Sequence, residues 1–240
     1  MSKELVAVVT GGSNGIGEGI VKHFAALGAT VINVDVAKPA DPAVAACPFL
    51  QVDLTDAKAT KEAAARIATD WPVNCVINNA GFPTPGYLED VTDEQFDHGV
   101  NLHMRTPLIL AQAFAPGMKA RRFGRIVNIS TRAILGKKAR SVYSATKAAL
   151  VGFTRTWAME LGPHGVTVNA IAPGPVLTEL FKKNNPPEVA AKLVEHAFVG
   201  RAGTPEDIAR AAYYFAEPAN GYVTGQVLHV CGGSSLTLNW

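Results

Sequence analysis

The sequence predicts a doubly wound α/β fold, in which helices cover both faces of a seven-stranded parallel sheet. Seven short runs rich in β-branched residues alternate along the chain with longer runs of helical spacing. The short runs are apolar throughout, which is typical of parallel strands that are buried on both faces. Because 48% of the residues are hydrophobic and 18% are charged, the chain can fill a large core.

Seven runs have the length and composition of buried strands: Leu5–Val9, Thr30–Asp35, Phe49–Val52, Cys75–Asn78, Arg125–Ile129, Val166–Ile171 and Gln226–Val230. Five longer runs have helical spacing: Ile16–Leu27, Asp56–Thr69, Val100–Lys119, Ser141–Leu161 and Pro205–Phe215. No linker, low-complexity segment or internal repeat interrupts this alternation. We therefore expect residues 1–240 to form one domain.

Composition argues against several other classes of protein. The 22 basic and 20 acidic residues give a net charge of +2, so neither nucleic acid nor a membrane is an expected partner. Cys47, Cys75 and Cys231 are widely separated, and the six histidines lack metal-ligand spacing, so we expect neither a disulfide framework nor a metal site. The apolar run Leu5–Val9 is too short for a signal peptide. We expect a cytoplasmic protein with reduced thiols.

A glycine-rich turn joins the first predicted strand to the first helix. It reads Thr10-Gly11-Gly12-Ser13-Asn14-Gly15-Ile16-Gly17. Glycines let the backbone approach a pyrophosphate closely, and the helix N-terminus supplies N–H donors and positive potential. A turn that binds nothing is the alternative, but the strand–turn–helix context favours a dinucleotide site.

Asp35 ends the second predicted strand, 18 residues after Gly17. A carboxylate at this strand end can accept hydrogen bonds from both hydroxyls of an adenosine ribose, and it repels a 2′-phosphate. Neither Asn14 nor Val36 is a cation that would bind that phosphate. The sequence thus favours NAD over NADP, and the alternative role of Asp35 is to cap a helix.

A serine, a tyrosine and a lysine have the spacing of an acid/base site. Ser130 follows the fifth predicted strand, and Tyr143 and Lys147 come 13 and 17 residues later. A separation of four residues places Tyr143 and Lys147 on one helix face. An ammonium group beside a phenol lowers the pKa of the phenol, which suits Tyr143 to proton transfer near neutral pH.

With the glycine turn, these residues resemble the short-chain dehydrogenase/reductase family. The resemblance extends from Leu5 to Gly233. It includes Asn78-Asn79-Ala80-Gly81 after the fourth strand, Pro173-Gly174-Pro175-Val176-Leu177-Thr178 after the sixth and Tyr222-Val223-Thr224-Gly225 before the seventh. It implies a Rossmann-like sheet of strand order 3-2-1-4-5-6-7, an NAD cofactor and hydride transfer between a secondary alcohol and a ketone.

The resemblance also implies a role for each matching residue. Tyr143 would transfer the proton, Ser130 would orient the substrate oxygen, and Lys147 would bind the nicotinamide ribose and depress the pKa of Tyr143. Asn101 would hold a water that links Lys147 to solvent, or would satisfy a helix kink. The cofactor would contact Tyr143 and Lys147 and also Gly11, Ser13, Asn14, Ile16, Gly17, Asp35, Asp53, Leu54, Asn79, Ala80, Gly81, Pro173, Gly174, Val176 and Thr178.

The family usually assembles as a tetramer, and two segments agree with a homotetramer here. Residues 106–118, within the predicted helix Val100–Lys119, carry no charge, and the uncharged chain end contains Leu236, Leu238 and Trp240. A monomer would expose these apolar side chains, so we expect subunits to bury them.

Two other functions remain open. The sequence also resembles the 3-oxoacyl-carrier-protein reductases, but only Arg121 of their two basic carrier-docking residues is present, since the second position is His164. Cys231 replaces the Asp that relatives commonly carry before the last glycines. The alternative from another class is a catalytically silent NAD-binding regulatory protein, although all four catalytic positions are filled.

The substrate is the least determined part of the prediction. Residues 177–200 are expected to form a lid of mixed apolar and basic character over the cleft. Four cations, Arg132, Lys137, Lys138 and Arg140, lie between Ser130 and Tyr143 with no acidic residue among them. They either form a solvated basic loop or attract a substrate that carries a carboxylate, a phosphate or an acyl carrier.

Overall fold

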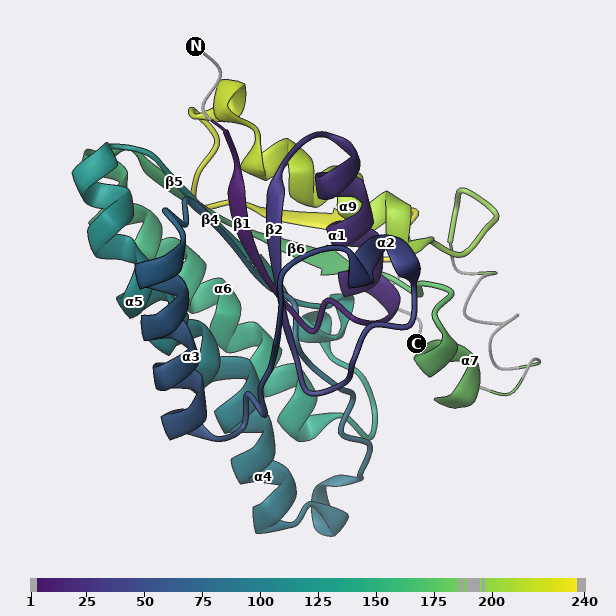
Figure 1. Ribbon diagram of the computed structural model, residues 1–240. Coiled ribbons are helices and arrows are strands. Elements are labelled where there is room, and N and C mark those ends of the chain that lie inside the picture. Colours follow the sequence, from purple (N-terminus) through teal and green to yellow (C-terminus); the bar gives the residue numbers. More distant parts are fainter. Residues whose placement is uncertain (1–3, 185, 187, 189–194, 196, 237–240) are drawn as a thin grey trace.

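The computed structural model describes residues 4–184, 186, 188, 195 and 197–236, and these residues form a seven-stranded sheet with helices on both sides (Figure 1). Neighbouring strands are parallel at every pairing, in the order β3-β2-β1-β4-β5-β6-β7. The strands are β1 Val6–Thr10, β2 Thr30–Asp35, β3 Phe49–Gln51, β4 Cys75–Asn78, β5 Gly124–Ile129, β6 Val166–Pro173 and β7 Val227–Val230. The predicted fold class and strand order are confirmed.

The central strands are buried along their whole length, as their continuous apolar sequences require. All five residues of β1 and all eight of β6 are buried, whereas the edge strand β3 has no fully buried residue. The strand β6 continues two residues past its predicted end, through Ala172 and Pro173. Pairing with β7 as far as Pro173 and Val230 accounts for this extension.

The helices lie close to their predicted positions, with three additions. They are α1 Gly15–Ala26, α2 Pro42–Ala45, α3 Ala57–Asp70, α4 Asp93–Val100, α5 Thr106–Arg121, α6 Ser141–Leu161, α7 Glu179–Asn184 and α9 Pro205–Ala216. The additions are α2, α4 and α7, and α2 begins after Asp41, whose side chain accepts a hydrogen bond from the backbone N–H of Ala43. No helix within the described part of the chain has the length and apolarity needed to cross a lipid bilayer.

Each face of the sheet has its own hydrophobic core. On one face α1 and α9 pack together and bury side chains such as Phe24 and Phe215. On the other face α3, α5 and α6 bury side chains such as Ile67, Phe114 and Trp157. Figure 1 shows α3, α5 and α6 side by side on one side of the strands, with α1 and α9 on the other.

The helical run predicted over Val100–Lys119 is interrupted. A π-helical turn, Asn101–Arg105, separates α4 from α5. Pro107 has no N–H and cannot donate to the carbonyl of His103 four residues earlier, which favours a wider turn here. The hydroxyl of Thr106 donates to the carbonyl of Asn101 at 3.1 Å and replaces part of the lost bonding. The π-turn packs against α6, and His103 on it is buried.

The strand order reverses between β1 and β4. Both strands pair with neighbours on opposite sides, β1 with β2 and β4 with β5. The loops that follow β1 and β4 therefore diverge over opposite faces of the sheet. Such a divergence opens a crevice at the carboxyl ends of the strands, which is where ligands bind in open α/β sheets.

Candidate active site

A cleft of about 1060 Å³ lies at the carboxyl ends of the strands. Most of the predicted site residues line it: Gly11, Asn14, Ile16, Gly17, Asp35, Asp53, Leu54, Asn79, Ala80, Gly81, Ser130, Tyr143, Lys147, Pro173, Gly174, Val176 and Thr178. The two predicted residues that do not line it are Ser13 and Asn101. The fold thus brings together segments that are spread over most of the sequence.

The glycine turn has a backbone that other residues would not adopt. Gly11 and Gly15 have φ angles of +64° and +57°, which L-residues rarely adopt. A Cβ on Gly17 would lie 1.9 Å from the carbonyl oxygen of Gly11, so the turn packs tightly against the first turn of α1. The amide of Asn79 donates to the carbonyls of Thr10 and Gly11 at 2.9 and 3.1 Å. This cradle at a helix N-terminus fits the pyrophosphate of a dinucleotide.

Ser13 has a different place from the one that the resemblance implies. Its side chain is fully buried, donates to the carbonyl of Ala37 at 2.7 Å and accepts from the amide of Asn33 at 3.0 Å. Its backbone N–H donates to the carboxylate of Asp35 at 2.9 Å. The structure therefore gives Ser13 a supporting role beneath Asp35, and its predicted contact with the cofactor stays a prediction.

The two acidic residues of the predicted cofactor site differ in their surroundings. Asp35 is buried, and its carboxylate accepts from the backbone N–H groups of Ser13 at 2.9 Å and Ala37 at 3.0 Å. Asp53 is exposed and accepts from the hydroxyl of Thr55 at 2.6 Å and from its N–H at 2.9 Å. These bonds to Thr55 lower the pKa of Asp53. Asp35 is thus held in one orientation at the wall of the cleft.

Ser130, Tyr143 and Lys147 meet where β5 ends beside α6. The hydroxyl of Ser130 donates to the backbone carbonyl of Lys147 at 2.8 Å, which ties the strand end to the helix. The ammonium of Lys147 donates to the carbonyl of Ile129 at 2.8 Å. Lys147 is only 3% exposed, and this burial lowers its pKa to about 7.

The surroundings of Tyr143 correct one sequence prediction. Burial raises the pKa of its phenol, while a hydrogen bond with Thr131 and the charge of Arg140 act in the opposite direction. Lys147, expected to lower this pKa, is not among the groups that do so. Its ammonium is directed at the carbonyl of Ile129, and removal of the phenol from water disfavours the phenolate.

Asn101 begins the π-turn, next to α6 but outside the lining of the cleft. Its backbone carbonyl accepts from the hydroxyl of Thr106. The position agrees with the kink that the sequence analysis gave as one of its two interpretations. Its role toward Lys147 stays a prediction.

His103 is the residue near the site that the sequence analysis missed. It is buried on the π-turn, and its ring lies edge-on to Tyr143 with 5.7 Å between ring centroids. Its Nδ1 lies 2.8 Å from the hydroxyl of Thr146, one residue before Lys147. A sequence signal existed, since His103 is a polar residue two positions after Asn101, but only the π-turn directs it toward α6.

The end of the cleft beside Tyr143 is basic. Arg132, Lys137 and Arg140 line it, as does Lys183 of α7, whereas Lys138 does not. Lys137 is exposed, and partial desolvation of its ammonium together with the charges of Arg140 and Arg132 lowers its pKa. Arg132 is buried and donates to the carbonyl of Ser234 at 2.9 Å.

The predicted lid is described only in part. Residues 185, 187, 189–194 and 196, including Val194 and His196, lie outside the described residues, as do Leu238 and Trp240 of the chain end. Of the rest, α7 contributes Phe181 and Lys183 to the cleft. Phe198 is exposed, at 66%.

Comparisons with known proteins cover almost the whole chain. The family model described as enoyl-(acyl carrier protein) reductase matches residues 11–235. The short-chain reductase protein NovJ of Streptomyces niveus is 35% identical, over 97% of this chain and 95% of its own. The 3-oxoacyl-acyl-carrier-protein reductase FabG of Vibrio harveyi is 33% identical, over 95% and 96%. The NAD-dependent glycerol dehydrogenase of Listeria innocua is also 33% identical, over 96% and 94%.

A solved structure agrees with the fold in detail. A candidate NAD(P)-dependent gluconate 5-dehydrogenase from Beutenbergia cavernae, with NADP bound at low occupancy, superimposes with a TM-score of 0.92. The two sequences are 32% identical, and the match covers 97% of each chain. The likeness in fold therefore extends over almost the whole chain.

Proposed function

The chain belongs to the short-chain dehydrogenase/reductase family of oxidoreductases, and we propose that it interconverts a secondary alcohol and a ketone with NAD(H). The observation that carries this proposal is the convergence of Ser130, Tyr143 and Lys147 at the cleft that also contains the glycine turn. A half-buried tyrosine and a buried lysine next to a dinucleotide cradle could remove the proton of an alcohol while bound nicotinamide accepts the hydride.

In the proposed reaction the carbinol carbon loses a hydride and its oxygen loses a proton. Bound nicotinamide supplies the hydride acceptor, or the donor in the reverse direction. Tyr143 takes the proton of the hydroxyl, or returns it to the ketone oxygen. Because burial raises the pKa of Tyr143, the phenol form predominates near neutral pH, which suits ketone reduction. Alcohol oxidation should become faster toward alkaline pH.

Ser130 and Lys147 would place the reacting groups. The hydroxyl proton of Ser130 is directed at the carbonyl of Lys147, so its oxygen can accept a hydrogen bond from the substrate hydroxyl. The ammonium of Lys147 would bind the ribose next to the nicotinamide. The proposed cofactor contacts otherwise follow the cleft-lining residues given above, with Ser13 supporting Asp35 from behind.

The preference for NAD rests on Asp35. Its carboxylate is held at the wall of the cleft by two backbone N–H groups and would face a 2′-phosphate at close range. Val36 beside it is exposed and lines the same region. Relatives use both cofactors, since the Listeria glycerol dehydrogenase is NAD-dependent and the Beutenbergia protein was solved with NADP. We therefore attribute the preference for NAD over NADP to the side chain of Asp35.

The basic end of the cleft supports an anionic substrate. Arg132, Lys137 and Arg140 line the side of the cleft that contains Tyr143, and Lys183 adds a further cation. Glu179 of α7 lines the cleft too and offsets part of this charge. A carboxylate or phosphate on the substrate would be attracted and oriented by these side chains. The alternative is that the loop is only a solvated basic surface.

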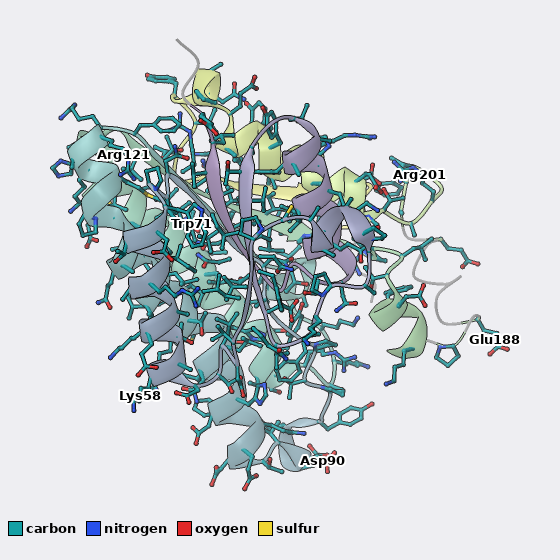
Figure 2. The ribbon with its side chains drawn as sticks, in the orientation of Figure 1. Lys58, Trp71, Asp90, Arg121, Glu188 and Arg201 are labelled. Carbon is teal, nitrogen blue, oxygen red and sulfur yellow. The ribbon has the colours of Figure 1, made fainter. Side chains whose placement is uncertain are left out.

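A 3-oxoacyl-acyl-carrier-protein reductase is the second candidate, favoured by the likeness to FabG of Vibrio harveyi. Arg121 is the one basic docking residue that is present. It lies at the end of α5, apart from α7 (Figure 2), and its guanidinium donates to the carbonyl of Val73. One of the two basic docking residues is thus replaced by His164, and the other, Arg121, is hydrogen-bonded within the chain. A silent regulatory protein is disfavoured because the catalytic positions are filled.

The proposal is tested by incubating purified protein with NAD⁺ and a panel of secondary alcohols, with matched ketones and NADH in the reverse direction. We expect turnover of at least one pair. NADH binding without turnover of any alcohol, ketone or 3-oxoacyl thioester would favour the regulatory alternative. Turnover restricted to 3-oxoacyl-carrier thioesters would favour the second candidate. The homotetramer and the cytoplasmic location stay predictions, and a monomeric mass at micromolar concentration would contradict the former.

A further inference from the structure

His103 is a buried titratable group to which the proposed mechanism gives no task. It is 1% exposed and packs against the rings of Tyr143 and Phe82. Burial lowers its pKa to about 2, and the charges of Lys147 and His98 act in the same direction. The imidazole is therefore neutral at neutral pH, and each ring nitrogen has a fixed role.

Two neighbours determine which nitrogen carries the proton. The hydroxyl of Thr146 donates to the carbonyl of Val142 at 2.8 Å, so its oxygen accepts a hydrogen bond from Nδ1 of His103, 2.8 Å away. On the other side of the ring, the backbone N–H of Phe82 donates to Nε2 at 3.4 Å. Both contacts require the tautomer with a proton on Nδ1 and a lone pair on Nε2.

The Nε2 atom and the ammonium of Lys147 border the same small space. A Cβ on Gly81 would lie 2.9 Å from Nζ of Lys147 and 3.0 Å from Nε2 of His103. The ammonium gives one of its three hydrogens to the carbonyl of Ile129. The lone pair of Nε2 is taken by the N–H of Phe82, but the ammonium lies no more than about 5.9 Å from Nε2, which is the negative end of the ring dipole in this tautomer.

On the basis of the proposed role of Lys147, we propose that His103 is a positioning residue. Its Nε2 accepts from the N–H of Phe82, which holds the Gly81–Phe82 backbone against α6, and as the negative end of the ring dipole it stabilises the nearby Lys147 ammonium. The partial negative charge of Nε2 favours the charged form of Lys147, which burial otherwise disfavours. His103 thereby keeps Lys147 charged and directed at the cleft without itself contacting substrate.

Two variants separate the two ends of the imidazole. In His103→Asn the amide N–H can still donate to Thr146, but no group remains at the position of Nε2. In His103→Gln the longer side chain can place its carbonyl oxygen near the position of Nε2. Fluorescence titration of NADH from pH 6 to 10 gives the pH midpoint at which affinity falls as Lys147 loses its proton. We expect this midpoint to move down by about one pH unit in His103→Asn, and by clearly less in His103→Gln.

A second measurement needs neither cofactor nor substrate. In protein with ¹⁵N-labelled histidine, the ring nitrogens of His103 should report a protonated Nδ1 and a bare Nε2, unchanged from pH 5.5 to 9. A protonated Nε2, or a titration of His103 in this range, would overturn the proposal even if His103→Asn failed to fold. An unmoved NADH midpoint in folded His103→Asn would overturn it as well.

The outcomes also distinguish this inference from the proposed function. If Tyr143→Phe retains substantial turnover, the proposed function fails whatever His103 does. If Tyr143→Phe is inactive but the midpoint of His103→Asn equals that of the unaltered protein, the function stands and His103 is only a packing residue. A downward shift in His103→Asn that His103→Gln partly reverses supports both.

Discussion

The proposed cofactor half and the proposed substrate half of the cleft are built in different ways. The cofactor half depends on the backbone: Gly11 and Gly15 adopt positive φ angles, and Asp35 is held by two N–H groups. The substrate half depends on side chains, among them the exposed Lys137 and Lys183. Where the backbone forms the site, its conformation restricts which residue types can occupy each position. Where exposed side chains form the site, many residue types can replace one another. We therefore expect substitutions in the cofactor half to reduce cofactor affinity strongly, and substitutions at the basic end of the cleft to reduce activity only slightly.

The largest effect is expected at the junction of the two halves. Tyr143→Phe removes the phenol oxygen that would transfer the proton, so we expect kcat to fall by ~10³-fold. Affinity for NADH should change little, because the cofactor half keeps its geometry. Steady-state kinetics with a substrate from the panel, together with fluorescence titration of NADH, checks both statements. If the affinity for NADH fell by as large a factor as kcat, Tyr143 would contribute to cofactor binding as well as to proton transfer.

Next in size is a change to the backbone-built half. Gly17→Ala would place a methyl group 1.9 Å from the carbonyl oxygen of Gly11, so the turn must move. We expect NADH affinity to fall by ~100-fold, about 2.7 kcal/mol, since the cradle loses its shape. Gly28→Ala is the matched control. At a φ of +84° an alanine is strained as well, but its methyl group would meet no atom within 4 Å. The control should lower stability by about 1 kcal/mol and leave NADH affinity unchanged.

A pH effect on stability is expected from the buried groups behind the catalytic residues. Folded His103 stays neutral down to about pH 2, whereas in the unfolded chain it takes up a proton near its ordinary pKa of 6.5. Below pH 6.5 the unfolded state therefore binds more protons, and the free energy of unfolding falls as pH falls. The stabilisation is complete above pH 6.5, and about 2 kcal/mol should be lost between pH 7 and 5.

Urea unfolding at pH 7 and pH 5 measures this loss, with His103→Phe as the comparison. The variant should be less stable at pH 7 but should lose about 2 kcal/mol less on acidification. Equal acid sensitivity in both proteins would mean that His103 is charged, or solvated, in the folded state.

Cofactor selectivity should change by a smaller amount. The unaltered protein is expected to prefer NAD(H) over NADP(H) by at least ~10-fold in kcat/KM, about 1.4 kcal/mol, because Asp35 repels the 2′-phosphate. Asp35→Asn keeps one acceptor oxygen for the backbone but removes the charge, and it should erode the preference. Parallel kinetics with both cofactors decides the matter. Equal efficiency in the unaltered protein would contradict the role of Asp35.

Substitutions at the basic end of the cleft should have the smallest effect on kcat/KM. For a keto acid, Lys137→Ala should lower kcat/KM by about 3-fold at low salt, because exposed charges steer an anion only weakly. For the methyl ester of the same acid it should have no effect, and the advantage of the acid should fade as salt rises. Lys138→Ala is the matched control, since Lys138 does not line the cleft. If the acid has no advantage over its ester at low salt, the loop is only a basic surface.

Local sequence was sufficient to predict the architecture and most of the proposed cofactor half. Strand composition predicts the sheet, and the family resemblance supplied the correct strand order. Gly11, Gly15 and Gly17 could be singled out because close backbone approach depends on residue type at that very position. In such cases the physical cause lies within a few residues of the chain, so the sequence displays it directly.

Tertiary structure decided what depends on partners distant in the chain. Ser13 turns its hydroxyl toward Ala37 instead of the cleft, and the π-turn that Pro107 favours carries His103 to Thr146. The pKa of Tyr143 moves upward because packing removes the phenol from water, a cost that the spacing of Tyr143 and Lys147 does not reveal. Spacing along a helix fixes which side chains share a face, but solvation and hydrogen-bond partners arise only when separate segments pack together.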